Sequence, residues 1–380
     1  MRVGAVRMSG DGTMERRNDE TALQERPQLA LALPIVPSFH RSVALPVLDA
    51  RLRGTKFVSL TPKSILNSPQ QTGVDFWSLN PYVGCEFGCS YCYARYAHRY
   101  VVERAHDTGN LSDGEFQEFR GPHGWEAFER RIFVKDQLLG ALEADLRRYY
   151  RSLSPSARQS VPIVIGTATD PYQPAERRFR LTRLILERLA RCEGLNIGII
   201  TKSPLVARDR DVLRRLQDSN DLEVYVSLIS VNGALIRKIE ARSPLPAVRL
   251  RALERLTAAG INAGLIVAPV LPGITDGLSH LEALFGAARE AGARFVHAGP
   301  LRLYPAVRER FLPVLGQHFP ELEERYAHAY TRRSNAPRGY AAALTRRIKR
   351  LQRKYGFPVN DGMQDRYERR LSPAQRELGL

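Results

Sequence analysis

The chain has 380 residues, of which 43% are hydrophobic, and carries a formal net charge of +17 at pH 7. This length is enough for one large core with appendages or for two modest domains. A membrane protein is not expected, because the most apolar N-terminal stretch, residues 29–36, is broken by Pro34 and followed by Pro37. The small number of cysteines and the lack of an export signal predict a cytoplasmic protein.

The positive charge has two interpretations, and the sequence leaves both open. A surplus of this size favours polyanionic partners such as nucleic acid, which bind through phosphate contacts. Alternatively, the charge reflects a generally basic composition, since arginine greatly outnumbers lysine.

In chain order, the first 50 residues show no sustained hydrophobic period and are predicted to form a flexible leader. Residues 57–60 begin the ordered part, and residues 76–82 are predicted as a first strand. We expect residues 94–104 to be a short basic segment and residues 107–124 a polar loop. Residues 131–134 are predicted to be extended, with Asp136 as the N-cap of the helix that follows.

From there strands and helices alternate. The predicted strands are 162–166, 197–200, 224–228, 261–269 and 294–298, and the predicted helices are 178–189, 206–216, 247–259 and 278–291. Such alternation implies right-handed βαβ units around a parallel sheet. Together with the first strand, it predicts an α/β fold with a partial (β/α)6, TIM-like barrel. The active site should then lie at the C-terminal ends of the strands.

The character of the chain changes after residue 303, where residues 307–315 and 321–330 are predicted to be helical. Further on, one helix face is apolar (Tyr340, Leu344, Ile348, Leu351 and Tyr355), and its opposite face is basic (Arg346, Arg347, Lys349, Arg350, Arg353 and Lys354). This basic face is either an arm for a phosphate backbone or the solvated side of a packed helix. The predicted domains are a leader (1–50), a barrel core (51–303) and a basic helical extension (304–380).

Three of the four cysteines, Cys85, Cys89 and Cys92, lie in one C-x3-C-x2-C run. Three thiolates cannot close a tetrahedral zinc site, nor can they fill all four positions of a [4Fe–4S] cluster. A cluster held by three thiolates leaves one iron open to an outside ligand. The alternative is a Cys3His zinc site completed by His98. The fourth cysteine, Cys192, is predicted to be a core residue.

Four short motifs occur in a fixed order, and the first two include cysteines of this run: NPYVGC at 80–85, YCYAR at 91–95, GTATDPYQPAE at 166–176 and TKS at 201–203. In this combination the chain resembles the spore photoproduct lyase-related, DNA-repair photolyase-like branch of the radical S-adenosylmethionine (SAM) superfamily. The resemblance extends over residues 61–303. It implies a [4Fe–4S] cluster and SAM as cofactors, and reductive cleavage of SAM to a 5′-deoxyadenosyl radical that abstracts hydrogen from a substrate.

The resemblance also implies roles for individual residues. Cys85, Cys89 and Cys92 would ligate the cluster, Tyr91 would contact the SAM adenine, Thr169 and Asp170 the SAM ammonium, Lys202 the SAM carboxylate, and Ser227 the ribose or carboxylate. Structural alternatives exist for the last four. Asp170 before a proline is also typical of a turn, and Lys202 could neutralise a helix end or a surface acid. Thr169 and Ser227 could satisfy nearby backbone groups.

Three positions bear on the reaction. Tyr91 and Tyr93 match a tyrosine pair that spore photoproduct lyase uses in its radical relay, so both are predicted to be catalytic. Thr167 stands near the place where that enzyme has a cysteine hydrogen donor. A threonine hydroxyl is a poor radical donor, so reversal of a thymine dimer by that route is not expected.

The predicted function is therefore that of a radical SAM enzyme, with nucleic acid as the first candidate substrate. The alternatives are a radical SAM enzyme that acts on a protein or small molecule, and a zinc-stabilised nucleic-acid-binding protein without enzymatic activity. The enzyme would require a reducing electron donor of the flavodoxin or ferredoxin type. The oligomeric state is left open.

Overall fold

A computed structural model of the protein describes residues 47–50, 54–109, 111–120 and 124–359, which all belong to one compact unit, Arg41–Leu380. Most of the predicted leader and the end of the chain after residue 359 lie outside the described residues. Within the described part, no helix is long and apolar enough to cross a membrane.

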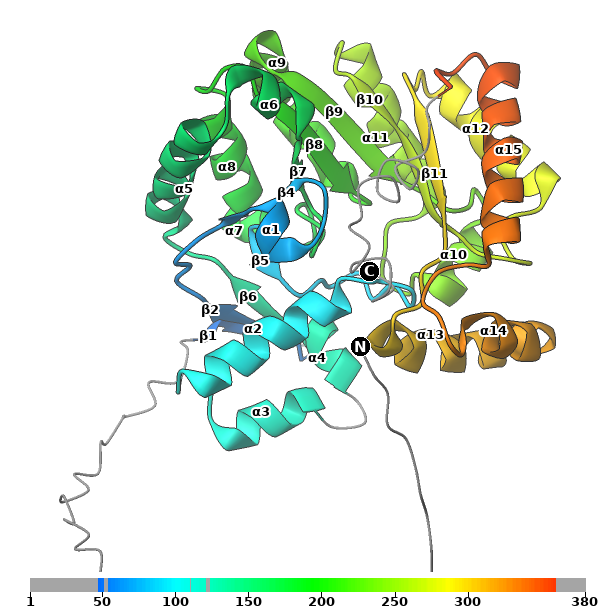
Figure 1. Ribbon diagram of the computed structural model, residues 1–380, viewed down its shortest axis with the longest axis horizontal. Helices are drawn as coiled ribbons and strands as arrows, with labels where there is room; N and C mark the ends of the chain where they lie inside the picture. The colour runs from blue at the N-terminus through cyan, green and yellow to red at the C-terminus, as the bar shows by residue number, and fades with distance from the viewer. Residues whose placement is uncertain (1–46, 51–53, 110, 121–123, 360–380) are drawn as a thin grey trace, which may run out of the picture. The chain divides into compact units, whose positions relative to one another are not determined.

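Seven strands form the larger sheet, in the spatial order β11-β10-β9-β8-β7-β4-β3 (Figure 1). They are β3 (Leu66–Asn67), β4 (Trp77–Leu79), β7 (Ile163–Ile165), β8 (Asn196–Thr201), β9 (Asp221–Ser227), β10 (Ala263–Val270) and β11 (Val296–Pro300). Neighbours from β4 to β11 are parallel, whereas β3 is antiparallel to β4. The six parallel strands follow one another in chain order. This arrangement confirms the predicted partial (β/α)6 barrel.

The helices of the described residues connect and cover these strands. They are α1 (Pro69–Thr72), α2 (Arg95–Asp107), α3 (Asp113–Arg120), α4 (Gly124–Arg130), α5 (Leu138–Ser152), α6 (Pro155–Ser160), α7 (Glu176–Phe179), α8 (Leu181–Leu189), α9 (Arg210–Ser219), α10 (Gly233–Ile239), α11 (Pro246–Ala258), α12 (Leu278–Glu290), α13 (Pro305–His318), α14 (Glu323–Tyr330) and α15 (Arg338–Lys354), with the 3₁₀ helices η1 (Pro204–Asp209) and η2 (Pro320–Leu322).

The main core lies between the outer face of the larger sheet and the helices. Alternate strand residues such as Ile165 and Ile199 join helix residues such as Leu213, Leu281 and Ile348 in one apolar cluster, and all of these are buried. This pattern follows from the two-residue period of a strand and the 3.6-residue period of a helix. Burial of this apolar area contributes more than any other interaction to the stability of such a fold.

The last parallel strand, β11, is covered by α15 rather than by the helix that directly follows it. The chain first forms α13 and α14 and then returns, so that α15 packs against both β11 and α12 (Figure 1). Gln352 within α15 donates a hydrogen bond to the Val296 carbonyl at 2.9 Å. The predicted apolar stripe of this helix is therefore part of the core.

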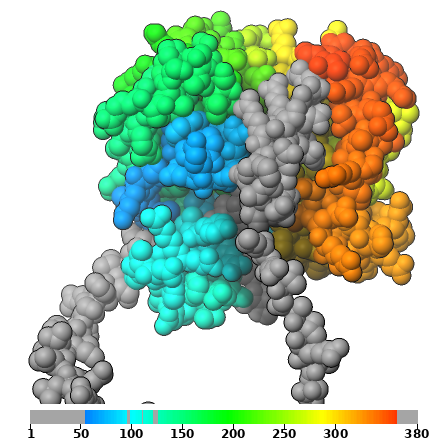
Figure 2. Space-filling model, in the orientation of Figure 1, coloured from blue at the N-terminus to red at the C-terminus, as the bar shows by residue number. Residues whose placement is uncertain are grey.

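A smaller sheet, in the order β1-β2-β6-β5, consists of β1 (Val47–Ala50), β2 (Lys56–Ser59), β5 (Tyr82–Val83) and β6 (Arg131–Val134). β2 and β6 are parallel, and β5 is antiparallel to β6. Helices α2, α3 and α4 pack on one another beside it and form one continuous surface (cyan in Figure 2). The cysteine run begins directly after β5.

Three local predictions were wrong. Residues 76–82 form two short strands, β4 and β5, in different sheets. Pro81 lies between them and has no N–H group to continue a ladder. Asp136 does not cap α5: the N-cap is Gln137, whose φ is 54°, and the Asp136 carboxylate accepts a hydrogen bond from Ser59 instead.

The third error is the polar loop expected at 107–124, which contains α3. Ser112 and Glu115 form reciprocal side-chain and backbone hydrogen bonds at the start of this helix. Such a Ser-x-x-Glu capping box is a known start signal that was visible in the sequence. Phe116 then gives α3 a buried residue.

Candidate active site

The cysteine run forms a loop after β5, and its backbone is bonded to the segment that follows β7. The Gly84 carbonyl accepts hydrogen bonds from the Thr169 hydroxyl at 2.6 Å and from the Gln173 amide at 3.1 Å. Gln173 in turn accepts from the Glu86 N–H at 3.0 Å, and the Glu86 carboxylate accepts from the Ala175 N–H at 2.8 Å. Two segments about 85 residues apart in the chain are thereby joined.

Two guanidinium groups hold the other side of the loop. Arg95 donates to the Cys89 carbonyl at 3.0 Å, and Arg242 donates to the Glu86 carbonyl at 2.7 Å. Both arginines also pair with Glu129, a carboxylate that is almost fully buried. A shared carboxylate keeps two like charges close together beside the loop.

Cys85 and Cys89 are buried, Cys92 is partly buried, and all three are free thiols. Burial raises the pKa of each thiol, most strongly for Cys85 and Cys89, and the nearby carboxylates of Asp170 and Glu240 add to this effect for those two residues, respectively. A metal can bind such thiols only by displacing their protons, which couples metal binding to pH.

The fourth cysteine lies elsewhere, as predicted. Cys192 follows α8 and belongs to the main core, where its sulfur accepts a hydrogen bond from Arg188 at 3.1 Å. It is therefore not a fourth ligand for the cysteine loop.

His98, the candidate fourth zinc ligand, is engaged in another environment. Its Nε2 atom is 3.2 Å from the Arg131 carbonyl oxygen, and its ring packs against Phe119, Phe128 and Phe133 at centroid distances of 5.4–5.6 Å. Burial lowers the pKa of His98 to about 4. The position favours a buried neutral histidine over a metal ligand.

The donor set therefore fits a cluster better than a single ion. In the part of the chain that is described, no three His, Cys, Asp or Glu side chains are grouped to hold one metal ion. Ligands of one tetrahedral zinc would need sulfur atoms about 3.8 Å apart, given a zinc–sulfur distance of about 2.3 Å. A [4Fe–4S] cluster instead spreads three thiolates over three different irons.

Three of the residues predicted to contact SAM lie together beside this loop. Lys202 directly follows β8, and its ammonium donates to the hydroxyl of Ser227, the last residue of β9, at 2.9 Å. The same nitrogen lies 5.6 Å from the centroid of the buried Tyr91 ring. The parallel register of β8 and β9 causes this meeting, because it pairs Thr201 with Val226.

Thr169 and Asp170 lie next to the loop, but the structure gives both of them partners within the chain. Thr169 donates to Gly84, as described above. Asp170 accepts hydrogen bonds from the Thr201 hydroxyl at 2.7 Å and from the backbone N–H groups of Tyr172 and Lys202 at 2.9 and 2.7 Å. Burial raises the pKa of Asp170 although these hydrogen bonds oppose the shift. Their contact with SAM stays a prediction.

The two predicted catalytic tyrosines differ in exposure. The Tyr91 side chain is buried, whereas Tyr93 is 42% exposed. The Thr167 hydroxyl is 2.7 Å from the Ser78 hydroxyl and accepts a hydrogen bond from the Asn80 amide at 3.1 Å. Thr167 thus belongs to a buried polar cluster at the ends of β4 and β7.

Sequence reasoning missed a buried ion pair behind these residues. The Glu240 carboxylate accepts hydrogen bonds from Tyr91, Ser243 and Arg249, and Lys202 lies 4.0 Å away. Burial alone would raise the pKa of Glu240, but Arg249 and Lys202 lower it to about 2. Tyr91 and Glu240 are 149 residues apart in the chain, so no local pattern could have shown that this ion pair lies behind the cysteine loop.

A second missed feature lies on the inner face of the barrel. The rings of Tyr225, Phe295 and His297 are 5.0–5.7 Å apart. Ile266 in β10 pairs with Ser227 on one side and with His297 on the other, so this cluster reaches the level of the predicted SAM contacts. A Cβ at Gly264 would be 2.3 Å from the Phe295 ring, so the glycine makes room for the cluster.

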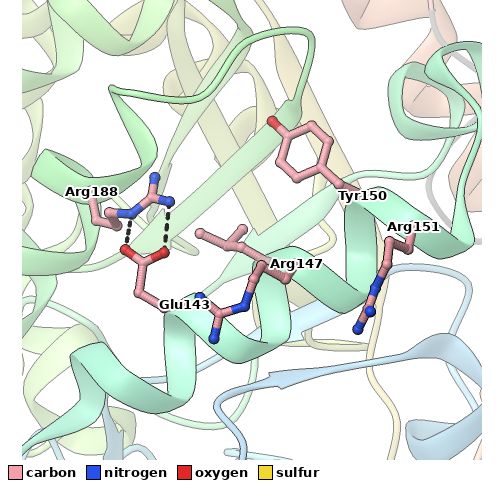
Figure 3. Close-up of a pocket in the computed structure, with 6 residues that line it drawn as sticks. Glu143, Arg147, Tyr150, Arg151 and Arg188 are labelled. Carbon is pink, nitrogen blue, oxygen red and sulfur yellow. Dashed lines mark hydrogen bonds and ion pairs between the residues drawn. The ribbon is translucent and has the colours of Figure 1, made fainter.

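A surface hollow of about 310 Å³ lies between α5 and α8, and none of the predicted site residues lines it (Figure 3). Arg188 and Glu143 form an ion pair at its edge, with Arg147 and Arg151 on the same helix as Glu143. The hollow is basic, but it lies on the outer helices of the barrel.

Comparisons with known proteins agree with this fold. Residues 142–284 match the family model of the Radical SAM superfamily. An uncharacterized protein of Mycobacterium tuberculosis is 33% identical over 317 residues, which are 83% of this chain and 84% of that protein. An uncharacterized protein of Methanocaldococcus jannaschii is 26% identical over 221 residues, or 58% of this chain and 70% of that protein.

Among solved structures, a double mutant of spore photoproduct lyase with bound AdoMet and dinucleoside spore photoproduct is similar to this chain. The TM-score is 0.57 at 15% sequence identity, and the alignment covers 80% of each chain. A likeness at this identity shows a shared fold.

Proposed function

Because the chain belongs to the radical SAM superfamily, we propose that Cys85, Cys89 and Cys92 hold its [4Fe–4S] cluster and that it cleaves SAM reductively to a 5′-deoxyadenosyl radical. The chain is a radical SAM enzyme, and its cofactors are a [4Fe–4S] cluster and SAM. As in other enzymes of this superfamily, a reductant is required; we propose a flavodoxin or ferredoxin in the cytoplasm.

The observation that carries the proposal is the contact between the cysteine loop and the C-terminal ends of β8 and β9: the Lys202 ammonium lies 5.6 Å from the ring centroid of Tyr91, which belongs to that loop, and 2.9 Å from the Ser227 hydroxyl. The bound cofactors supply a reactive carbon radical, and the protein supplies binding, orientation and exclusion of water. Lys202 offers a point charge for the SAM carboxylate, with the Ser227 hydroxyl beside it. The Tyr91 ring offers a flat apolar face for adenine.

The contacts in the structure give less support to the remaining proposed roles. Thr169 and Asp170 supply acceptors for the SAM ammonium, in addition to the bonds that they already make within the chain. Tyr91 and Tyr93 take part in the radical relay, in which a tyrosine gives up its phenolic hydrogen atom and takes over the radical. Thr167 is held by Ser78 and Asn80 and is not used as a hydrogen donor.

We propose nucleic acid as the substrate. The net charge of +17 supports this, and spore photoproduct lyase, which shares the fold, has been crystallised with a dinucleoside. The rings of Tyr225, Phe295 and His297 add a surface on which a base could stack. A protein or small-molecule substrate is the second candidate.

The test is anaerobic purification with iron, sulfide and zinc analysis, followed by reduction in the presence of SAM. We expect about four irons and four sulfides per chain and release of 5′-deoxyadenosine. Replacement of Cys85, Cys89 or Cys92 by alanine should abolish iron binding, whereas Cys192→Ala, the matched control, should retain it. Zinc alone, with SAM left intact, would contradict the proposal.

The zinc-stabilised binding protein is tested with His98→Ala. If His98 were a zinc ligand, its removal would release the metal and unfold the metal-dependent part of the protein. We expect the metal content to be unchanged, because His98 contacts a backbone carbonyl and three phenylalanine rings. Loss of bound metal in this variant would favour the zinc interpretation.

A further inference from the structure

Glu240 is a fully buried carboxylate that lies one residue after α10. Its partner Arg249 is also fully buried. Besides Glu240, the Arg249 guanidinium donates to the Pro244 carbonyl at 2.7 Å, the Ser243 hydroxyl at 2.6 Å and the Ser227 carbonyl at 2.8 Å. Two buried opposite charges with this many hydrogen bonds form a rigid unit, because either charge alone would be costly to bury.

This unit touches three of the five residues that the proposed function assigns to SAM, namely Tyr91, Lys202 and Ser227. The Tyr91 hydroxyl donates to Glu240, and the Lys202 ammonium lies 4.0 Å from the same carboxylate oxygen. Arg249 holds the backbone of Ser227, whose hydroxyl accepts from Lys202 at 2.9 Å. The ring, the ammonium and the hydroxyl therefore converge on one ion pair.

The same residue is also joined to the cysteine loop through the backbone. Cys89 and Glu240 form an antiparallel bridge, and the Ser90 N–H donates to the Ile239 carbonyl at 2.9 Å. A shift of Glu240 would therefore displace both the cysteine loop and the Lys202 ammonium.

Lysine is a flexible point charge, and fixing its four rotatable bonds costs conformational entropy of up to about 2 kcal/mol. A partner that fixes the ammonium before SAM arrives removes this cost from binding. Glu240 can act in this way because its own position is fixed by Arg249 and Ser243. Burial would lower the pKa of Lys202, but the Glu240 carboxylate keeps it raised, so the ammonium stays charged.

We propose that Glu240 is a positioning residue that orients Lys202 and Tyr91 for SAM, with Arg249 as its anchor. This inference rests on the proposed function, since it assumes that Lys202 receives the SAM carboxylate. Glu240 itself contacts the two side chains and not the reacting atoms. It acts by fixing where the ammonium and the ring stand.

The test measures SAM binding rather than turnover. Cluster-loaded protein is dialysed anaerobically against SAM and, separately, against decarboxylated SAM, which lacks the carboxylate. In Glu240→Gln we expect SAM to bind about 10- to 100-fold more weakly, the range typical of outer-shell partners. The affinity for decarboxylated SAM should fall much less in this variant, because decarboxylated SAM has no carboxylate to contact Lys202. Iron content should stay at the wild-type level.

The matched control is Glu223→Gln. Glu223 also accepts a hydrogen bond from a tyrosine hydroxyl, that of Tyr225, and both residues belong to β9. None of the partners described for Glu223 is a predicted SAM residue. SAM affinity in this variant should stay within about twofold of the wild type, which is well below the effect expected of an outer-shell partner.

Glu240→Gln leaves Arg249 as a lone buried charge, which can prevent folding. The double variant Glu240→Gln/Arg249→Gln avoids that problem and is measured in the same way. Unchanged SAM affinity in whichever variant folds would overturn the inference, and so would equal losses for SAM and decarboxylated SAM. If the wild-type protein itself takes up no [4Fe–4S] cluster or no SAM, the proposed function fails, which is a separate result.

Discussion

At the scale of single residues, Gly88 shows how closely the cysteine loop is packed. Its φ is 65°, and a Cβ there would lie 2.8 Å from the Arg242 guanidinium and 2.9 Å from the Glu129 carboxylate. These two side chains form the ion pair that holds the loop. The backbone conformation favours glycine at this position, and an added Cβ would displace the ends of both paired side chains.

We predict that Gly88→Ala destabilises the protein and lowers its iron content. The control is Gly194→Ala, because Gly194 has a φ of 70° with nothing within 4 Å of the added Cβ. Gly194→Ala should lower the free energy of unfolding by about 1–2 kcal/mol because of the backbone conformation alone. Gly88→Ala should lower it by more. Urea unfolding and iron analysis of both variants check this. Equal costs and equal iron contents would show that the ion pair yields freely.

Burial of Lys135 makes the stability of the folded protein depend on pH. Burial lowers its pKa to about 8, although Asp145 opposes the shift. In the unfolded chain the pKa of lysine is about 10.4. Between these two values the unfolded state binds more protons than the folded state, so this group makes stability increase with pH there.

We expect Lys135→Met to be more stable than the wild type at pH 7, by on the order of 3 kcal/mol. This difference in the free energy of unfolding between the variant and the wild type should shrink as the pH rises from 8 and should vanish by about pH 10.5. Urea unfolding at several pH values tests this, with the exposed Lys56 as the control position (Lys56→Met). A constant difference across this pH range would contradict the prediction.

At the scale of elements, α15 decides between the two interpretations of the basic C-terminal face. Leu344, Ile348 and Leu351 are buried in the main core, and Arg347 and Lys354 are bonded to the Asp276 carbonyl and the Glu282 carboxylate. The helix therefore completes the barrel. These contacts favour the solvated face of a packed helix over an arm that follows a phosphate backbone.

Accordingly, a variant with Arg346, Arg350 and Arg353 replaced by glutamine should fold like the wild type, whereas truncation after Pro337 should unfold the protein. Each lost phosphate contact would reduce the slope of log binding constant against log salt concentration by about 0.9. We expect the three replacements to leave this slope for DNA binding almost unchanged, because the basic face of α15 is expected to be solvated and not bound to phosphates. Arg147→Gln/Arg151→Gln, on the exposed side of α5, is the control (Figure 3). A fall of about 2 or more in the slope for α15 alone would identify it as the nucleic-acid interface.

At the scale of the whole molecule, the cysteine loop joins distant parts of the chain. It is bonded to Phe128 at the end of α4, to Gln173 before α7 and to Ile239 in α10. A cluster bound to this loop would stabilise all three junctions together, because a ligand that binds only the folded state raises its stability.

Removal of the cluster by a chelator should lower the thermal midpoint by about 5 °C or more. It should also open the loop to proteolysis. Cys192→Ala should show the same shift as the wild type, because Cys192 lies in the main core. Identical midpoints with and without the cluster would mean that the apo loop is already as stable as the loaded one.

The order of strands and helices in the barrel was predictable because it depends on neighbouring residues. Apolar runs such as residues 163–165 and the helical spacing of Leu181, Ile185 and Leu189 are local patterns. The errors came where a distant contact outweighed the local signal. Asp136, for example, accepts a hydrogen bond from Ser59, 77 residues away, and does not cap the next helix.

The amino-acid sequence was sufficient to identify the family, the barrel and the three candidate thiols, because spacing along a chain specifies them. The charges that stand behind those thiols became evident only in the folded protein. Glu240 meets Arg249 across 9 residues but Tyr91 across 149, so the ion pair joins the segment after β9 to the cysteine loop only in the folded chain. A buried ion pair depends on exclusion of water from both partners at once, and that is a property of the folded chain and not of any stretch of it.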